Sequence, residues 1–323
     1  MKAILATKYG PPEALQLAEV ETPAPKEDEI LIKVQAASIN PLDLQVRGGL
    51  ARVWGGLRRP KDPRLGRDVA GQVAAVGSRI TMFKPGDEVF GGCAGSFAEY
   101  AIAHENRLAL KPANRTFEEA AAAPVAALTA LQGLRDKGQV RLGQKVLING
   151  ASGGVGTFAV QIAKSFGAEV TAVCSPRQLD RARAIGADHV IDYSQIDFTQ
   201  TDHRYDLIFA VNGYHSITAY RRALTPRGNY VAVGGSFAQI LQALLLGRLF
   251  SKSGGQKMGF MGIAEITTKD LGIVKELLES GKVVSVIDRH YPLSETGLAL
   301  QYLEEGHARG KVVITLEPDN KTR

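Results

Sequence analysis

The segment Asn149-Gly150-Ala151-Ser152-Gly153-Gly154-Val155-Gly156 constrains the fold of this chain more strongly than any other. It follows a short apolar run, Lys145–Ile148, and opens a stretch from Val155 to Phe166 whose apolar residues recur at helical spacing. A glycine-rich turn between a buried strand and an amphipathic helix is typical of a parallel sheet that binds a dinucleotide. The G-x-x-G-x-x-G spacing is a variant of the usual fingerprint, and a tight turn without a ligand is the alternative.

Each glycine of this segment has its own expected role. We expect Gly150 to allow the turn off the strand and Gly156 to let the helix pack closely on that strand. Gly153 and Gly154 would let backbone N–H groups approach a pyrophosphate at the positive end of the helix.

Strand-like and helical segments alternate after this loop, which predicts right-handed crossovers on a parallel sheet. The expected strands are Glu169–Cys174, Val190–Tyr193, Asp206–Val211 and Tyr230–Val233, with a helix at Gln178–Ile185. Just before the loop, an alanine-rich helix is expected from Glu118 to Leu134.

The first 120 residues show a different pattern, in which short strands alternate with turns. The expected strands are Lys2–Leu5, Glu29–Val34 and Val69–Val76, and proline and glycine interrupt the sequence between them. This pattern predicts a compact, barrel-like β domain. The final run, 310–315, is strand-like and is expected to return to one of the domains.

The residues after the second strand of the parallel sheet favour NADPH over NADH. NAD sites carry an acidic residue there that holds the ribose 2′-hydroxyl, whereas this chain has Cys174-Ser175-Pro176-Arg177. The Ser175 hydroxyl can hydrogen-bond a 2′-phosphate and Arg177 can pair with it, while Tyr193 could reach the same group from the third strand. The alternatives are a solvated cation for Arg177 and a surface tyrosine for Tyr193.

Length and composition limit the remaining possibilities. The 323 residues suggest about two domains, and 45% apolar with 22% charged residues are typical of a soluble globular protein. The net charge of +6 suits an anionic small molecule as well as nucleic acid. Two cysteines exclude a disulfide framework, no signal peptide is recognisable, and the apolar run Ile240–Phe250 is too short to span a membrane. We therefore expect a cytoplasmic protein without stable membrane insertion.

Several further motifs follow one another along nearly the whole chain. They include Ser38-Ile39-Asn40-Pro41-Leu42-Asp43, Gly66 to Gly71, Phe83 to Val89, Phe97-Ala98-Glu99-Tyr100, Gly186-Ala187-Asp188 and His307 to Ile314. With the glycine loop, they resemble the zinc-free quinone oxidoreductase branch of the medium-chain dehydrogenase/reductase superfamily. The resemblance implies an α/β protein. It would have a GroES-like β-rich domain, residues 1–120 with a return of 290–323, and a Rossmann domain with a doubly wound parallel sheet, residues 121–289.

The resemblance also implies a nicotinamide cofactor between the two domains. The pyrophosphate is expected at Ser152, Gly153, Gly154 and Val155, and the 2′-phosphate at Ser175, Arg177 and Tyr193. The other expected contacts are Thr129, Asn212, Val233, Gly234, Gly235, Phe260 and Met261. Asn40 and Asp43 are expected to face the substrate, and Lys311 is a further candidate for the cofactor site, with closure of the barrel as its alternative role.

Two departures from the zinc-dependent members argue against a metal. Those enzymes place a cysteine where Asn40 stands and a His-Glu pair where Arg67-Asp68 stands, and a catalytic zinc needs about three such ligands. The expected chemistry is therefore zinc-independent hydride transfer from NADPH. Asn40 is the candidate donor to the carbonyl oxygen on which charge develops, with bracing of the turn before Pro41 as its alternative. Asp43 would orient Asn40 or a water, and no residue stands out as the proton donor.

The expected function is NADPH-dependent reduction of a quinone or of an α,β-unsaturated carbonyl compound. The alternative is a nucleotide-sensing or RNA-binding module that retains the fold with little turnover, although no aromatic-rich RNA motif supports it and no nucleic acid partner is expected. A homodimer is compatible with the sequence. The basic run between Arg47 and Arg67 is expected to be a solvated loop or an anion-attracting lip. The Ile240–Phe250 run is expected to be a helix over the cleft or at a subunit contact.

Overall fold

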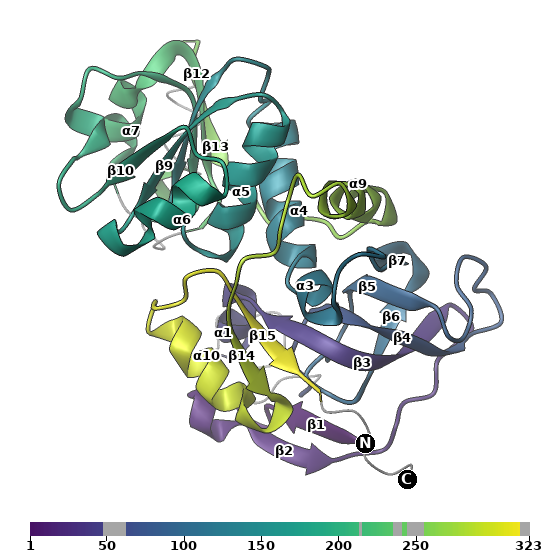
Figure 1. Ribbon diagram of the computed structural model, residues 1–323. Helices are drawn as coiled ribbons and strands as arrows, with labels where there is room; N and C mark the ends of the chain where they lie inside the picture. The colour runs from purple at the N-terminus through teal and green to yellow at the C-terminus, as the bar shows by residue number, and fades with distance from the viewer. Residues whose placement is uncertain (48–62, 213–214, 235–240, 244–254, 317–323) are drawn as a thin grey trace. The chain divides into compact units, whose positions relative to one another are not determined.

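The computed structural model describes residues 1–47, 63–212, 215–234, 241–243 and 255–316, and the chain divides into two compact units (Figure 1). Unit 1 comprises Met1–Val125, Ile266–Gly281 and Ser285–Arg323, and unit 2 comprises Ala126–Glu265 and Lys282–Val284. The division after Val125 falls inside helix α4 (Pro124–Gln132) rather than at residue 120.

The chain also returns to unit 1 earlier than we expected, at Ile266 rather than at residue 290. The reason is helix α9 (Thr268–Glu279), whose Leu271, Val274 and Leu278 are buried. The capping of this helix comes from the same unit, since the Arg115 guanidinium donates to the Leu278 carbonyl. The segment 282–284 then belongs to unit 2, so the chain passes between the units four times.

Unit 2 is built on a six-stranded sheet in which all neighbouring strands are parallel. The strand order is β10-β9-β8-β11-β12-β13. The chain runs outward from β8 to β10, crosses to β11 on the other side of β8, and runs outward again to β13. The reversal between β8 and β11 is the switch point at which such sheets bind ligands. The strands are β8 Lys145–Asn149, β9 Glu169–Cys174, β10 His189–Asp192, β11 Tyr205–Ala210, β12 Leu224–Ala232 and β13 Lys257–Phe260.

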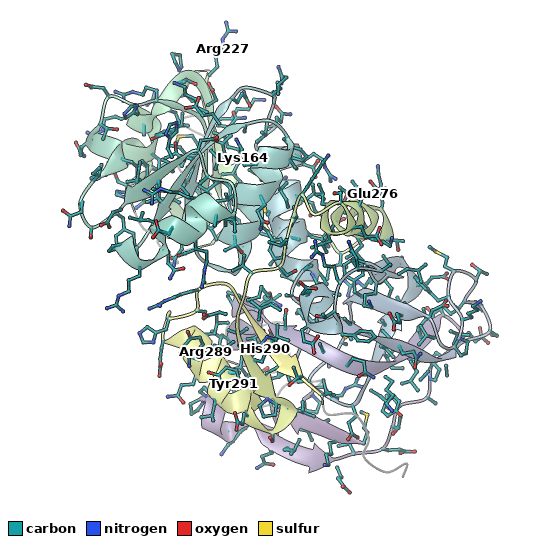
Figure 2. All side chains as sticks on the ribbon, in the orientation of Figure 1. Lys164, Arg227, Glu276, Arg289, His290 and Tyr291 are labelled. Atoms are coloured by element: carbon teal, nitrogen blue, oxygen red, sulfur yellow. The ribbon has the colours of Figure 1, made fainter. Side chains whose placement is uncertain are left out.

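The central strands of this sheet are apolar along their length because helices cover both faces of a parallel sheet. Val146, Leu147 and Ile148 on β8 and residues 207–210 on β11 are fully buried. Lys164, labelled in Figure 2, lies on α5 (Gly154–Ser165). Its ammonium lies 2.8 Å from both carboxylate oxygens of Asp188, and this contact joins α5 to the segment leading into β10. The helical segments are α4, a π-helical turn Gly133–Lys137, α5 Gly154–Ser165, α6 Leu179–Ala184, α7 Ile217–Ala223 and short 3-10 turns at Pro176–Gln178 and Phe198–Gln200.

Unit 1 contains a seven-stranded, mostly antiparallel sheet and a separate pair, β1 with β2. The long strand β3 organises it: β15 pairs with Ala36–Ile39, β6 pairs with Glu29–Lys33, and β4 pairs along the opposite edge. The strands are β1 Lys2–Leu5, β2 Gln16–Glu19, β3 Glu29–Ile39, β4 Asp68–Val76, β5 Glu88–Gly92, β6 Tyr100–His104, β7 Leu108–Leu110, β14 Ile287–Pro292 and β15 Lys311–Thr315. The helical segments are α1 Pro41–Arg47, α3 Phe117–Ala121, α9, α10 Thr296–Glu304 and 3-10 turns at Pro12–Ala14, Glu105–Arg107 and Leu293–Glu295.

The helix expected from Glu118 to Leu134 is two helices, α3 and α4, followed by the π-helical turn. Proline has no N–H and fits the first turn of a helix, so Pro124 begins α4 rather than continuing α3. Most of the basic run between Arg47 and Arg67, and most of the Ile240–Phe250 run, lie outside the described residues. In the part of the chain that the structure describes, no helix is long and apolar enough to cross a membrane.

Candidate cofactor site and active-site residues

The glycine loop turns sharply between β8 and α5. Gly150 has a φ of +87°, a conformation that favours glycine, and a Cβ at this position would lie 2.8 Å from the Asn212 nitrogen. A Cβ on Gly156 would overlap with the Gly150 carbonyl oxygen, so this glycine allows the helix to pack directly on the loop. These two glycines have the structural roles that the sequence predicted.

The first turn of α5 presents backbone N–H groups to the carboxyl end of the sheet. The first hydrogen bond of the helix runs from Thr157 N–H to the Gly153 carbonyl at 2.9 Å, so the N–H groups at 154–156 precede the intrahelical ladder. Among the described residues, no side chain caps this helix, whose N-cap is Gly153. Ser152 to Val155 are only partly buried. N–H groups that precede the intrahelical ladder, together with the positive end of the helix dipole, suit an anion such as a pyrophosphate.

The ends of β9 and β10 lie beside this loop. The N–H groups of Gly150 and Ala151 donate to the Val173 carbonyl at 3.2 and 3.1 Å. Asp192 pairs with Cys174, and the Tyr193 N–H donates to the Cys174 carbonyl, so Tyr193 and Ser175 leave adjacent strand ends together. Both Arg177, on the 3-10 turn after β9, and Tyr193 are exposed. The three residues predicted for the 2′-phosphate therefore belong to one edge of unit 2.

The remaining predicted contacts of unit 2 follow the strands on the other side of β8. Asn212 follows β11, and its N–H donates to the Asn149 carbonyl. Val233 and Gly234 follow β12, while Phe260 ends β13 and the Met261 N–H donates to the Ala232 carbonyl at 2.8 Å. Thr129 lies one turn before Gly133, beside which Met261 packs. Gly235 lies outside the described residues.

Asn149 holds the start of the glycine loop in place through its hydrogen bonds, and the sequence analysis predicted no separate role for it. Its side-chain Nδ2 donates to the Tyr220 hydroxyl at 3.1 Å, and its carbonyl accepts from the N–H groups of Val211 and Asn212. Tyr220 is fully buried and stacks near Tyr230, with ring centroids 4.5 Å apart. Asn149 thereby fixes the end of β8 against β11 at the switch point. An amide directly before the first glycine was the only available signal.

A second group of candidate residues forms a buried polar cluster in unit 1, which we call the Asn40 cluster: Ser38, Asn40, Asp43, Asp68 and Lys311. The strand register brings its members together. Asp68 pairs with Ser38 across β3 and β4, and Val312 pairs with Ile39 across β15 and β3, which places Lys311 beside Asn40. All five side chains are at most 3% exposed.

Asp68 is the functional candidate that the sequence analysis missed. One of its carboxylate oxygens accepts from the Ser38 hydroxyl at 2.7 Å, from Asn40 Nδ2 at 2.9 Å and from Lys311 Nζ at 3.4 Å. The other oxygen accepts from the Val125 N–H at 2.9 Å. Asp68 therefore joins β3, β4, β15 and the backbone at Val125 through a single side chain. In the sequence, the available signal is an acid at the start of an apolar strand-like run, Asp68–Val76, within the motif Gly66 to Gly71.

Lys311 was predicted for the cofactor site, with closure of the barrel as its alternative role. Its ammonium is buried in unit 1, where it donates to Asn40 Oδ1 at 2.7 Å and to the Ile39 carbonyl at 3.2 Å. Burial lowers the pKa of Lys311, and the neighbouring Asp68 and Asp43 oppose that effect. Within unit 1 its partners are the Asn40 cluster and the end of β3.

Asp43 lies at the third position of α1 and accepts a hydrogen bond from the Asn40 backbone N–H at 2.8 Å. Burial raises the pKa of Asp43 to about 7, although the Asn40 N–H opposes this rise. The Asp68 charge raises the pKa of Asp43 further, and Lys311 and Arg67 lower it. The two acids of the cluster differ in their contacts, because Asp68 accepts from four donors, whereas Asp43 accepts from the Asn40 N–H.

The two thiols are buried and unreactive in character. Burial raises the pKa of Cys93 to about 12 and that of Cys174 to about 11. A thiol with such a pKa has little thiolate at neutral pH and is a poor nucleophile. In the described part of the chain, no three His, Cys, Asp or Glu side chains gather as a metal site would require.

Comparison with known proteins identifies the class that this fold and these residues define. Residues 26–113 match the family described as "Alcohol dehydrogenase GroES-like domain", and residues 185–314 match that described as "Zinc-binding dehydrogenase". The molecule is therefore an oxidoreductase of the α/β type, with a GroES-like domain and a Rossmann domain, as the sequence predicted.

Similar proteins define the family more narrowly. The chain is 35% identical over 330 residues to the "Quinone-oxidoreductase homolog, chloroplastic" of Spinacia oleracea, covering 97% of this chain and 98% of that protein. It is 33% identical to the "NADPH-dependent alkenal/one oxidoreductase, chloroplastic" of Arabidopsis thaliana (97% and 79%) and 32% identical to the mitochondrial "NAD(P)H oxidoreductase RTN4IP1" of Bos taurus (98% and 89%). The chain belongs to the quinone oxidoreductase homologues of the medium-chain dehydrogenase/reductase superfamily.

Solved structures agree with this assignment. The quinone oxidoreductase from Coxiella burnetii has a TM-score of 0.87 at 31% identity, covering 98% of this chain and 99% of that one. The Escherichia coli quinone oxidoreductase, solved in complex with NADPH, has a TM-score of 0.84 at 26% identity, covering 98% and 100%. These matches confirm the predicted family and fold. The names are those of oxidoreductases, and none supports the alternative of an RNA-binding module.

One prediction is contradicted by these comparisons. We expected a cytoplasmic protein, but the relatives are named as chloroplastic or mitochondrial proteins. The prediction was wrong because it rested on two free cysteines and the lack of an apolar leader. Free thiols indicate a reducing environment, which several compartments share, and not one location.

Proposed function

We propose that this protein is an NADPH-dependent reductase of quinones or α,β-unsaturated carbonyl compounds. The observation that carries the proposal is the uncapped first turn of α5 at the switch point of the unit 2 sheet, in a chain that belongs to this family. Bare backbone donors at this place suit the pyrophosphate of a dinucleotide. The family itself uses NAD(P)H, and the choice of NADPH is part of the proposal.

The preference for NADPH rests on the residues at the ends of β9 and β10. Ser175, Arg177 and Tyr193 offer two hydroxyls and a guanidinium to a 2′-phosphate. The nearest carboxylate of that edge, Asp192, already accepts from the N–H and the hydroxyl of Ser194 at 2.9 and 2.7 Å. It therefore has its own partners and is less suited to hold a ribose hydroxyl.

When bound, NADPH supplies the hydride. The acceptor oxygen of the substrate then gains negative charge, and we propose that Asn40 donates an N–H to it. One N–H of Asn40 Nδ2 points to Asp68. Among the described residues, the acceptor for the other N–H is the Ser38 carbonyl at 3.5 Å, a marginal distance. Asp43 holds the backbone of Asn40 in place through its hydrogen bond to the Asn40 N–H.

The decisive experiment is NADPH oxidation by the purified protein across a panel of quinones and enones. We expect turnover with at least one quinone or one acrolein-like enone, and the ratio of the two rates assigns the preferred class. Binding of NADPH without oxidation by any member of the panel would contradict the proposal.

Arg177→Ala tests the cofactor preference. We expect this change to weaken NADPH binding by about 1–3 kcal/mol, because a charge-assisted hydrogen bond is lost, and to change NADH binding far less. Calorimetry with both cofactors measures the difference. The matched control is Arg183→Ala, which removes a nearby arginine that pairs with Asp180 at 2.8 Å. An equal effect of Arg177→Ala on both cofactors would contradict the assignment.

A further inference from the structure

The side chain of Asn40 is hydrogen-bonded to residues outside the helix that it precedes. An asparagine at this position usually accepts a hydrogen bond from a backbone N–H of the first turn. Here the Asp43 N–H donates to the Asn40 backbone carbonyl at 2.9 Å instead, while Asn40 Oδ1 accepts from the Lys311 ammonium at 2.7 Å. The amide is therefore held by Lys311 and Asp68, on two strands distant in sequence.

This pair of charges allows only one orientation of the amide. An ammonium can only donate, so the atom facing Lys311 must be the Asn40 oxygen. Asp68 Oδ2 acts as an acceptor toward the Ser38 hydroxyl and the Lys311 ammonium, so the Asn40 atom that faces it must be the nitrogen. A rotation of the amide by 180° would place its NH₂ group against the Lys311 ammonium, which are both donors, and its oxygen against the Asp68 carboxylate, which are both acceptors.

Contact with Lys311 also changes the amide electronically. A cation at the amide oxygen polarises the group, and hydrogen bonds in a chain strengthen one another in a low-dielectric interior. The Asn40 cluster is such an interior, since Asp68 is 0% and Lys311 is 3% exposed. The remaining N–H of Asn40 is thus a stronger donor than an isolated asparagine would provide.

We propose that Lys311 and Asp68 are positioning residues for the reduction, which orient and polarise the Asn40 amide toward the acceptor oxygen. The inference rests on the proposed function, because it requires that Asn40 donate to the substrate. Negative charge on that oxygen is absent from the bound substrate and develops in the transition state, so the pair acts on kcat more than on the binding of either substrate. A buried ion pair brings little net stability, and a role in orienting Asn40 gives a reason for its presence.

The kinetic test is a double-mutant cycle between Lys311 and Asn40, followed by NADPH oxidation with the best quinone or enone. We expect Lys311→Met to lower kcat about 10- to 100-fold, as for the loss of part of an oxyanion contact, with KM for NADPH changed less than about threefold. In the background of Asn40→Leu, the same change should have no further effect on kcat, because Lys311 acts through Asn40. Equal losses in both backgrounds would overturn the proposal.

A second variant separates an effect on kcat from an effect of misfolding. Removing Lys311 alone leaves the Asp68 charge buried and unpaired, so we add Lys311→Met/Asp68→Asn, in which both charges are removed. This double variant should fold and still show the reduced kcat; a kcat within about threefold of the wild type would overturn the proposal. Lys275→Met is the matched control, since Lys275 pairs with Glu279 at 2.7 Å on α9 of the same unit.

A readout without turnover separates this proposal from the proposed function. In the cofactor-free protein, NMR of the side-chain amides should show Asn40 NH₂ protons that exchange slowly, assigned by their loss in Asn40→Leu. In Lys311→Met/Asp68→Asn they should exchange at least tenfold faster, and unchanged exchange would overturn the proposal. If the wild type shows the slow amide but reduces no quinone or enone, the proposed function fails while the orientation of Asn40 stands.

Discussion

Asp43 shows how one residue can obey a local rule and still have an unusual ionisation. An acid at the third position of a helix commonly accepts from the N-cap N–H, as Asp43 does from Asn40. That bond alone favours the charged form. Burial outweighs it and raises the pKa of Asp43 to about 7.

The raised pKa makes Asp43 a source of pH-dependent stability. Unfolded Asp43 would lose its proton near 3.8, and folded Asp43 near 7, so the native state binds more protons between these values. The free energy of unfolding should therefore fall as pH rises from about 4 to about 7, and stay low above. Asp43→Asn removes this penalty, so at pH 8 the variant should be more stable than the wild type by roughly 1–4 kcal/mol.

Urea unfolding at pH 5 and pH 8 measures this effect. The variant should show a smaller loss of stability between the two pH values than the wild type. Asp202→Asn, at an exposed position, serves as the control and should follow the wild type. An equal pH dependence in Asp43→Asn and in the wild type would show that Asp43 is already ionised in the folded protein at pH 5, and would contradict the prediction.

At the level of elements, regular hydrophobic patterns predicted the strands and helices of unit 2 well. β9 has the expected bounds and β8 ends one residue later than expected, while β10 and β11 each begin and end one residue earlier than expected. In unit 1, β3 continues beyond the predicted end, Val34, to Ile39. The sequence pattern did not predict this continuation because residues 35–38 are small or polar, and their place in the sheet depends on pairing with β15 and β4. The Asn40 cluster is built on that continuation. Its partners are distant in sequence, so local patterns could not reveal it, whereas the glycine loop is a local signal.

Two alanine substitutions in the glycine loop separate the fold of this element from its proposed ligand. Gly156→Ala would place a Cβ 2.8 Å from the Ala151 Cα and against the Gly150 carbonyl oxygen, so it should destabilise unit 2 by about 1–3 kcal/mol. At Gly153 an added Cβ would lie 3.8 Å from the Gly150 carbonyl oxygen, an ordinary van der Waals distance. The φ of this residue is −79°, which alanine readily adopts. Gly153→Ala should keep the stability of the wild type but weaken NADPH binding about tenfold or more, by crowding the pyrophosphate.

Thermal unfolding and NADPH titration of both variants measure these outcomes. The control is Gly272→Ala on α9, where a Cβ has open space among the described atoms. It should leave NADPH binding unchanged and raise stability by about 0.5–1 kcal/mol, because alanine favours a helix. If Gly153→Ala bound NADPH as well as the wild type, the pyrophosphate would not lie against this backbone.

For the whole molecule, the sequence predicted two domains but not how the chain is shared between them. The expected boundaries followed changes in composition, at residues 120 and 290. The observed division follows burial instead, and assigns α9 to unit 1 although the chain on both sides of it belongs to unit 2. Its attachment depends on single side chains such as Asn114 and Arg115, which a composition profile does not register.

Arg115→Ala tests how α9 is held in unit 1. Arg115 donates through Nε and Nη2 to the Leu278 carbonyl at 3.1 and 2.7 Å, at the negative end of the helix. Its loss leaves that carbonyl without these donors and should cost about 1–3 kcal/mol of unfolding free energy. Arg227→Ala, at an exposed arginine (Figure 2), should change stability by less than about 0.5 kcal/mol. Equal effects in chemical denaturation would show that the Arg115 bonds contribute nothing.

The repeated passage of the chain between the units has a consequence for cleaved forms of the protein. A single nick between Gly281 and Ser285 leaves β3 on the longer fragment and β15 on the shorter one, and these two strands pair along Ala36–Ile39. The fragments would also share the Lys311–Asp68 ion pair. Such a nicked protein should stay assembled, and the two pieces, made separately, would be suited to reconstitution as a split protein.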